Sequence, residues 1–313
     1  MNLPEDKDIL RGDIRAVARA IRAVEDDWPG SRALLTRLFP HAGRALTLGI
    51  TGPPGAGKST LVDRLTTLFR KAGKTVGVVA VDPTSPFTGG AILGDRIRMQ
   101  NHATDDGVFI RSMATRGALG GLSATTAAAL LVLDASSKDI LIVETVGVGQ
   151  DEVDIASEAD LAVVVLVPGL GDEVQALKAG IMEIADVFVV NKADRDGADR
   201  LASEIEMMLS LTGETKGDRP PVVRTIASSS QGIEDLMKTI DEVRARREAS
   251  GQLAQRRRER LLRQFEREVE VLVKEKVRQR IDALDQSLKL RERVQNRAVD
   301  PYTAADETVS GAS

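Results

Sequence analysis

Residues 44–60 read Arg44-Ala-Leu-Thr-Leu-Gly-Ile-Thr-Gly-Pro-Pro-Gly-Ala-Gly-Lys-Ser-Thr60, and this stretch decides the fold. The apolar run at its start predicts a buried strand, and residues 60–72 carry leucines at helical spacing. Between them lies the pattern G-x-x-x-x-G-K-[ST] of a phosphate-binding loop. The loop residues are Gly52, Pro53, Pro54, Gly55, Ala56, Gly57, Lys58 and Ser59. A strand, this loop and a helix predict a P-loop in an α/β fold with a doubly wound, mostly parallel sheet.

Each residue type in this loop has a chemical reason. Glycines let backbone N–H groups approach the phosphates closely, and the helix that starts near Thr60 directs its positive dipole end at them. Lys58 is the expected catalytic cation for the β- and γ-phosphates, and the Ser59 hydroxyl is a ligand for Mg²⁺. A glycine-rich surface turn would not explain the Lys-Ser pair.

The composition narrows the class of protein. The chain has 313 residues, a net charge of −4, no cysteine and 3% aromatic residues. It therefore has no thiolate metal site, and neither its charge nor its aromatic content favours nucleic acid as a partner. The polar N-terminus is unlike a signal peptide, and the apolar runs are too short to span a membrane. We expect a soluble cytoplasmic protein.

The chain divides into four expected regions. Residues 1–43 predict an N-terminal helical extension, 44–250 the P-loop domain, 251–297 a C-terminal helical arm and 298–313 a disordered tail. The domain alternates apolar, β-branched runs with helical patterns, as in a parallel sheet covered on both faces. Strands are expected at 45–50, 75–82, 139–145, 160–168, 186–191 and 221–227. Helices are expected at 122–135, 171–184, 198–211 and 233–248.

The arm carries an apolar stripe at helical spacing that includes Leu261, Phe265 and Val269. The stripe can pack back on its own domain or form a homodimer contact. The basic run 256–258 can be a solvated helix face or a nucleic-acid patch, and we favour the former.

A second motif predicts which base is bound. Asn191-Lys192-Ala193-Asp194 follows an apolar strand downstream of the P-loop. In P-loop proteins this N-K-x-D pattern reads guanine, because the aspartate accepts from N1–H and the exocyclic amine, which adenine does not present. The end of the next strand would support the base through Ile226, Ala227 and Ser228, in only partial agreement with the Ser-Ala-Lys/Arg loop of many GTPases.

Two carboxylates end predicted strands beside the P-loop. Asp82 ends the second strand and Glu144 the third, so both are expected at the edge where such sheets bind ligands. Glu144 can hold Mg²⁺ or its waters, and the Gly147 N–H can sense the γ-phosphate. Asp95 lies on a glycine-containing segment and is either a further metal ligand or a helix N-cap.

The residue that orients water in small GTPases is missing, because Val148 follows Gly147. Gln150 is near, and Gln175 and Lys178 are further candidates for catalysis. We expect slow hydrolysis that a partner accelerates. The isolated His41 and His102 are assigned no chemistry.

Five motifs together resemble a known family: residues 52–60, Val81-Asp-Pro-Thr-Ser-Pro86, Leu93-Gly-Asp-Arg-Ile-Arg-Met99, Glu144-Thr-Val-Gly-Val-Gly-Gln150 and residues 191–194. From about residue 8 to 290, the chain looks like the MeaB, ArgK and methylmalonic aciduria type A family of SIMIBI-class P-loop GTPases. The resemblance implies GTP, GDP and Mg²⁺ as ligands. It implies a chaperone that gates adenosylcobalamin loading and protects methylmalonyl-CoA mutase or a related acyl-CoA mutase.

The resemblance also implies roles for single residues. Asp82, Asp95 and Glu144 would surround the metal, and Gln175 and Lys178 would belong to a switch that responds to the mutase. The C-terminal helices would form a homodimer. Residues 226–228 depart from the family, where Ser-Ala-Arg is usual, in the detail of how the base is supported.

Three other functions are open to a P-loop protein of this kind. A nickel-inserting GTPase needs Cys or His ligands, and this chain has no cysteine and two separated histidines. A kinase linked to basic amino-acid transport needs an acceptor pocket, for which no sequence feature is found. A regulator that only binds nucleotide would not need the set of metal carboxylates.

Overall fold

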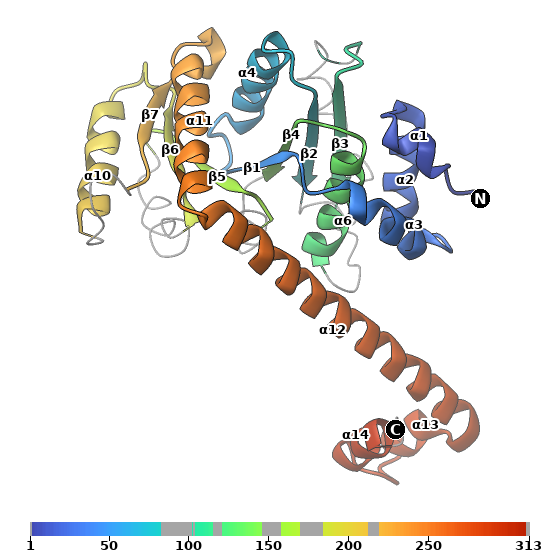
Figure 1. The fold of residues 1–313 in the computed structure, drawn as a ribbon. Helices are drawn as coiled ribbons and strands as arrows, with labels where there is room; N and C mark the ends of the chain where they lie inside the picture. Colours follow the sequence, from blue (N-terminus) through green and yellow to red (C-terminus); the bar gives the residue numbers. More distant parts are fainter. Residues whose placement is uncertain are drawn as a thin grey trace. The chain divides into compact units, whose positions relative to one another are not determined.

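The computed structural model of the chain describes residues 2–82, 102, 104–114, 121–145, 158–169, 184–211 and 219–310. These residues form a seven-stranded sheet in the order β3-β2-β4-β1-β5-β6-β7, and all neighbouring strands are parallel (Figure 1). The strands are β1 Leu46–Thr51, β2 Val76–Asp82, β3 Val108–Ala114, β4 Ile140–Thr145, β5 Leu161–Leu166, β6 Val187–Asn191 and β7 Val222–Thr225. The predicted doubly wound, parallel α/β fold is confirmed.

The strand that leads into the P-loop lies at the centre of the sheet. Every residue of β1 is buried, and β1 pairs with β4 on one side and β5 on the other. The chain fills the β4 side first and then continues outward through β5, β6 and β7. The strand order therefore reverses beside β1, and ligands of doubly wound sheets bind at such a reversal, outside the carboxyl ends of the strands.

The sequence reasoning missed one strand, β3. It reads Val-Phe-Ile-Arg-Ser-Met-Ala and pairs only with β2, so it is an edge strand. An edge strand does not need the continuous apolar run that marks a strand with two neighbours. Arg111 illustrates this, because its guanidinium pairs with Glu25 of the N-terminal helices.

Helices cover both faces of the sheet. One face packs its apolar side chains, such as Ile50 and Ile142, against α4 Lys58–Lys71 and α11 Ile233–Ala249. The other face is covered by α6 Gly121–Ala135 and α10 Ala198–Ser210. Successive residues of one strand serve opposite faces, as Val163 and Val164 show. This double coverage explains the unbroken apolar runs of the central strands.

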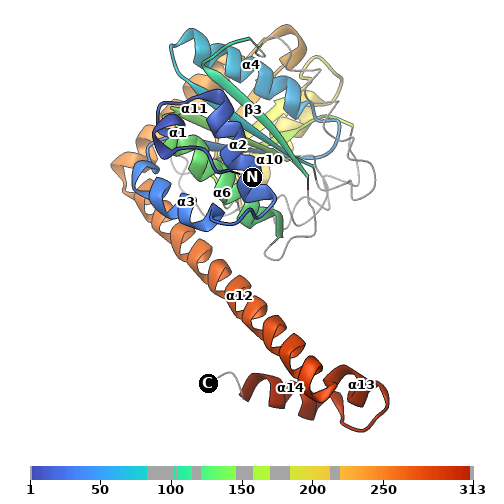
Figure 2. The same ribbon diagram turned by 90° about the vertical axis from the view of Figure 1, so that its right-hand side faces the viewer.

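The N-terminal segment forms three short helices, α1 Asp6–Leu10, α2 Ile14–Glu25 and α3 Ser31–Leu38, which lie beside α6 (Figure 2). The amphipathic pattern predicted over this segment is interrupted at Gly12, whose φ is +79°. Asp13 then caps α2 by accepting from Ala16 N at 2.7 Å. Ile21 and Leu38 share one apolar core with α6, so the segment packs as part of the domain.

Arginines bind two buried aspartates at the amino-terminal edge of the sheet. Asp160, directly before β5, is 0% exposed and pairs with Arg257 at 2.5 Å and Arg260 at 3.1 Å. Asp186, directly before β6, pairs with Arg256 at 2.7 Å and with Arg247. Arg256 and Arg257 of the basic run are thus not part of a free solvated face, because their charges pair with buried carboxylates of the sheet, whereas Arg258 is exposed.

Residues 261–313 form a separate unit. It holds the rest of α12, whose bounds are Gln252–Leu288, followed by α13 Leu290–Gln295 and α14 Pro301–Ser310. α12 and α13 lie within residues 251–297, for which a helical arm is predicted. The tail predicted to be disordered instead contains α14, because Asp300 accepts from Thr303 N at 2.9 Å and so caps the helix. Hydrogen bonds from Thr303 lower the pKa of the Asp300 carboxyl.

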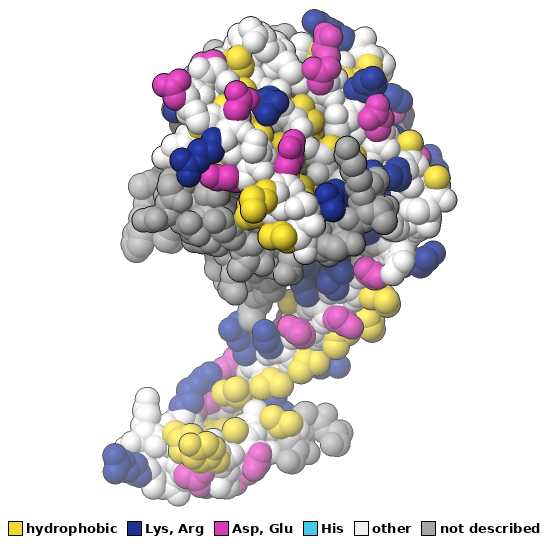
Figure 3. All heavy atoms as spheres, turned by 90° about the vertical axis from the view of Figure 1, so that its left-hand side faces the viewer, with side chains coloured by type: hydrophobic (Ala, Val, Ile, Leu, Met, Phe, Trp, Pro, Cys, Tyr) yellow, Lys and Arg dark blue, Asp and Glu magenta, His cyan; other side chains and the backbone are white. Residues whose placement is uncertain are grey.

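The apolar stripe of α12 is exposed to solvent. Figure 3 shows apolar side chains following the helix, and Leu262 and Phe265 are 62% and 65% exposed. Leu261, Val269, Leu272 and Val273 are more than 40% exposed as well. Within the ranges described, no helix combines the length and apolar content that a bilayer span requires.

Candidate nucleotide-binding site

The P-loop joins the end of β1 to the start of α4. Gly57 is the N-cap of α4 with φ +88°, a left-handed conformation that favours glycine. A Cβ at Gly57 would lie 2.5 Å from Asn191 Nδ2, and one at Gly52 would lie 2.1 Å from Val165 O. The loop therefore packs against β5 and the N-K-x-D segment with no room for side chains at these positions. Such a loop at a helix N-terminus presents backbone donors suited to phosphate groups.

Lys58 is the first residue of α4, and its side chain is buried at the loop. Its Nζ donates to Gly52 O at 2.6 Å and to Pro53 O at 3.0 Å. Only 6% of Lys58 is exposed, so the loop carbonyls hold the ammonium at the helix N-terminus. The predicted cation therefore lies between the P-loop carbonyls and the first turn of α4.

Ser59 and Glu144, both predicted metal ligands, are brought together by the sheet. Ser59 Oγ donates to Glu144 Oε1 at 2.5 Å, although 85 residues separate them. Glu144 is 2% exposed, and it faces Ile50 in the parallel register of β1 and β4. One residue further along, Thr145 Oγ1 donates to Thr51 Oγ1 at 3.2 Å. These contacts fix the end of β4 beside the P-loop.

Asn191, at the end of β6, connects three segments of the site. Its Nδ2 donates to Ala56 O at 2.8 Å, and its Oδ1 accepts from Thr225 Oγ1 and Ala227 N, each at 3.1 Å. The side chain is 2% exposed, so both ends of the amide are satisfied inside the protein. Asn191 thus ties the P-loop to the loop after β7 rather than pointing to an open space.

The next residues of the N-K-x-D motif form a turn that contacts the P-loop. Lys192 has φ +56°, and its Nζ donates to Gly55 O at 2.7 Å. Asp194 follows on the same turn, and its side chain is exposed. An exposed carboxylate on an anchored turn can accept two hydrogen bonds from a ligand. This is the arrangement that the guanine prediction requires.

The predicted base-supporting segment forms a short loop. Ile226 N donates to Gln231 O at 3.0 Å, and Ala227–Ser229 form a 3₁₀-helix. Ala227 is 3% exposed, whereas the Ser228 side chain is exposed. The structure therefore brings residues 226–228, Asn191 and the P-loop to one edge of the sheet.

Several predicted site residues lie outside the part of the chain that the structure describes. Asp95, Gly147, Gln175 and Lys178 lie outside the described residues, as does Gln150. Asp82 is the last residue of β2. No cluster of three or more His, Asp or Glu side chains arranged to hold a metal occurs in the described part of the chain. Ser59 and Glu144 nevertheless supply the oxygen donors that Mg²⁺ prefers, so their chemistry fits this ion.

Some residues that build the site were not found by sequence reasoning. Thr225 holds the Asn191 amide, and Thr51 and Thr145 connect β1 to β4. Arg64 of α4 donates from Nε to Ala227 O at 3.3 Å. The three strand-end threonines could have been noted from their places next to motif residues. Arg64 has no such signal, because only the packing of α4 brings it to residue 227.

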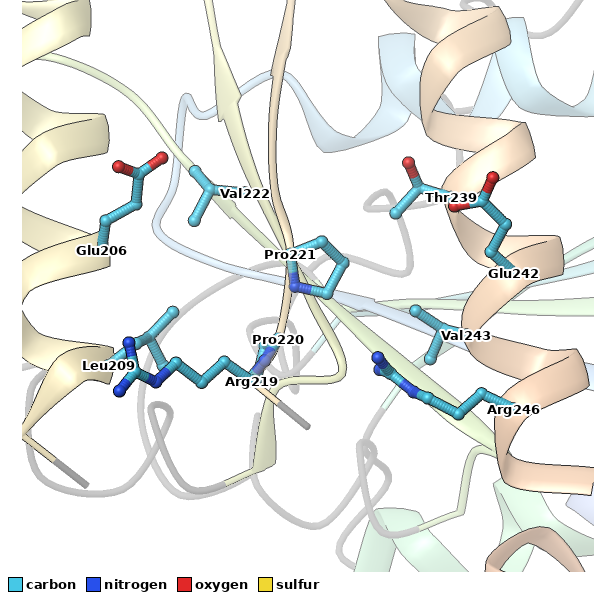
Figure 4. A pocket seen from close by; sticks show the side chains of 10 residues that line it. All are labelled: Glu206, Leu209, Arg219, Pro220, Pro221, Val222, Thr239, Glu242, Val243 and Arg246. Carbon is cyan, nitrogen blue, oxygen red and sulfur yellow. The ribbon is translucent and has the colours of Figure 1, made fainter. Parts of the chain in front are cut away.

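A pocket of about 620 Å³ lies elsewhere in the domain (Figure 4). It is found between α10 and α11 at the start of β7, with Pro221 and Val222 between the two helices. Arg219 and Arg246 line it together with Glu206. Because β7 begins here and ends at the base-supporting loop, the pocket is at the opposite edge of the sheet from the P-loop. None of the predicted site residues lines it.

Known GTPases are similar to this chain in sequence. The family profile described as methylmalonyl-CoA mutase-associated GTPase MeaB matches residues 17–285. A protein of Pyrococcus abyssi named as a GTPase is 52% identical over 302 residues, covering 95% of this chain and 92% of its own. The methylmalonic aciduria type A homolog of Mus musculus, a mitochondrial protein, is 36% identical over 267 residues, covering 80% of this chain and 64% of its own.

A solved structure shows the same fold. The crystal structure of a protein named LAO/AO transport system kinase superposes with a TM-score of 0.68 at 27% identity, covering 97% of this chain and 95% of that one. The extent of the family match and the P-loop geometry lead to one conclusion. This chain is a GTPase that belongs to the MeaB family of methylmalonyl-CoA mutase-associated GTPases.

Proposed function

We propose that this cytoplasmic protein uses a slow GTP cycle to gate adenosylcobalamin loading of a cobalamin-dependent acyl-CoA mutase and to protect that enzyme. Methylmalonyl-CoA mutase is the first candidate partner. The observation that carries the proposal is the convergence of the P-loop, Glu144 and the Asn191 segment in a chain that the MeaB profile matches over residues 17–285.

Different residues of the site are proposed to bind different parts of the nucleotide. The N–H groups of residues 52–59 and the Lys58 ammonium would hold the phosphates, and Asp194 would accept from the guanine base. Ser59 and Glu144 would hold Mg²⁺, with Asp82 and Asp95 as further proposed ligands. When bound, the ion would neutralise charge on the phosphate oxygens. Asn191 keeps the base-reading and phosphate-binding parts at a fixed separation.

Hydrolysis is proposed to need the partner, since Val148 follows Gly147 where small GTPases place a glutamine. Gln175 and Lys178 are proposed to act once a mutase is bound. The decisive experiment measures phosphate release from GTP with and without purified candidate mutases. We expect a slow rate for the protein alone and acceleration by one mutase. If no cobalamin-dependent mutase changes the rate, the chaperone proposal is wrong.

The assay also separates the alternatives. A kinase would transfer the γ-phosphate to an acceptor, so labelled phosphate would appear on protein or a small molecule rather than as free phosphate. A regulator that only binds would show no turnover even with the mutase. A nickel-inserting function would require nickel binding that depends on GTP. Phosphate release that responds to a mutase and leaves no labelled acceptor would support the chaperone.

The protein is further proposed to form a homodimer through α12. Six large apolar residues between 261 and 273 are at least 41% exposed, and such a stripe on a helix usually covers a partner helix. Leu262→Glu with Phe265→Glu should reduce the sedimentation mass from two chains to one. Met207→Glu, an exposed apolar residue of α10, is the matched control. A wild-type protein that sediments with the mass of one chain would contradict the dimer.

A further inference from the structure

A closed chain of hydrogen bonds connects the P-loop helix to the loop after β7. Arg64 Nε, on α4, donates to Ala227 O at 3.3 Å, and Ala227 N donates to Asn191 Oδ1 at 3.1 Å. Asn191 Nδ2 then donates to Ala56 O at 2.8 Å, which returns to the loop that begins α4. The base-supporting segment is therefore held from two directions, by the end of β6 and by α4.

Ala227 takes part in both the hydrogen bond from Arg64 and the hydrogen bond to Asn191. It is 3% exposed, so its backbone groups are removed from water and need partners inside the protein. Asn191 satisfies its N–H, and its carbonyl accepts from the Arg64 guanidinium and from Ser230 N, each at 3.3 Å. The segment itself reads Ile-Ala-Ser-Ser-Ser over residues 226–230 and carries no basic side chain. The cation at this loop thus comes from α4.

The remaining contact of Arg64 does not explain its position. Its Nη1 lies 3.8 Å from Asp63 Oδ2, beyond hydrogen-bond distance, and 36% of its side chain is exposed. Across the ranges that the structure describes, the bond to Ala227 is its only hydrogen bond. Arg64 is also six residues beyond Lys58, about 9 Å along the helix axis. Its contact is with the base-supporting loop and not with the phosphate cradle.

We infer that Arg64 is a positioning residue for guanine selectivity, which holds the backbone of residues 226–228 at a fixed place beside the P-loop. The inference rests on the proposed guanine-nucleotide site. With its carbonyl held from α4, the segment would keep the Ser228 N–H in one orientation, so this donor can favour an acceptor such as guanine O6. Adenine presents a donor at the same position. Without Arg64, the loop would lose this orientation while the phosphate cradle would stay intact.

The test compares the affinities of three probes, namely GDP, ADP and pyrophosphate, each with Mg²⁺, for the full chain by calorimetry. For Arg64→Ala we expect GDP affinity to fall about tenfold, the range for loss of a hydrogen bond from a charged donor. Affinities for pyrophosphate and ADP should change less than about twofold. Arg64→Lys should recover only part of the GDP affinity, because lysine lacks the planar guanidinium fork.

Arg70→Ala is the matched control on the same helix. Arg70 pairs with Asp105 at 2.8 Å and, in the described part of the chain, forms no hydrogen bond with residues 226–228, so its removal should leave the GDP-to-ADP ratio unchanged. Equal losses of GDP and pyrophosphate affinity in Arg64→Ala would show a general disturbance of α4 and overturn the inference. An unchanged GDP-to-ADP ratio in that variant would overturn it as well, while leaving the guanine site supported. A wild type that binds ADP as tightly as GDP would overturn both the guanine site and the inference.

Discussion

The Ser59 hydroxyl donates to Glu144 Oε1 at 2.5 Å, joining the first turn of α4 to the end of β4. Glu144 is 2% exposed, so a buried carboxylate faces the phosphate-binding loop. A buried carboxylate is stable when it is paired with a donor or a cation. The pair therefore suits a Mg²⁺ ion that would bring its own positive charge.

Glu144→Gln is expected to reduce GTP hydrolysis more than nucleotide binding. The amide keeps the volume but removes the charge that a metal ion needs, so the rate should fall by roughly 10- to 100-fold. GDP affinity measured without Mg²⁺ should stay within about threefold of the wild type. Phosphate release measured over a Mg²⁺ titration checks this. A wild-type Mg²⁺ dependence in the variant would contradict a metal role for Glu144.

Asp194→Asn is expected to change which base is preferred. A carboxylate accepts from the N1–H and amine of guanine, whereas an amide can donate to the carbonyl that xanthine has in place of the amine. GDP affinity should fall at least about 100-fold, and xanthosine diphosphate should become the better ligand. Competition binding with the two nucleotides provides the measurement. Asp196→Asn, an exposed aspartate on the same turn, is the control, and a similar effect there would contradict the assignment.

Gly57→Ala is expected to disrupt the site without unfolding the domain. Its φ of +88° disfavours alanine, and the added Cβ would lie 2.5 Å from Asn191 Nδ2. The side-chain amide would have to move, which breaks its bond to Ala56 O. Nucleotide affinity should therefore drop sharply. Gly73→Ala has a φ of +75° with open space around it, and it should lose only about 1 kcal/mol of stability with normal binding.

Asp160→Asn is expected to destabilise the domain strongly. Asp160 is 0% exposed and pairs with both Arg257 and Arg260, so removal of its charge leaves arginines without a counter-ion. Breaking a buried pair on one side costs about 3–5 kcal/mol, which corresponds to a decrease in Tm of roughly 10 °C. Calorimetric unfolding checks this. Arg200→Ala, which breaks an exposed pair with Glu204, should cost less than about 1 kcal/mol.

The ion pair of Asp105 with Arg70 should make stability depend on pH in the acid range. Hydrogen bonds from the Arg70 guanidinium, followed by the Gly107 N–H, lower the pKa of the Asp105 carboxyl. A carboxyl with a lowered pKa in the folded state stabilises the protein above its unfolded pKa of about 3.9, and this stabilisation is lost as the pH falls further. Asp105→Asn should therefore lower Tm at pH 7 and lower it less at pH 3. If the difference in Tm between the wild type and Asp105→Asn were the same at pH 7 and pH 3, this prediction would be contradicted.

The chemistry of the site could be predicted from the sequence because its motifs are local. Residues 52–59 and 191–194 each need only a strand end and a short turn, which the neighbouring apolar runs indicate. The same runs predicted the other buried strands. The edge strand β3 and helix α14 were missed, since Arg111 and Ser112 interrupt the apolar run of β3 and α14 depends on a cap at Asp300.

By itself, the sequence determined the parallel α/β fold, the P-loop and the N-K-x-D turn, because spacing along one segment fixes the local backbone. Only the tertiary structure decided which distant groups meet. The register of β1 with β4 brings Glu144 to Ser59, and the packing of α4 brings Arg64 to Ala227. These contacts join residues 85 and 163 positions apart. Such pairings follow from the packing of whole strands and helices, which no local pattern specifies.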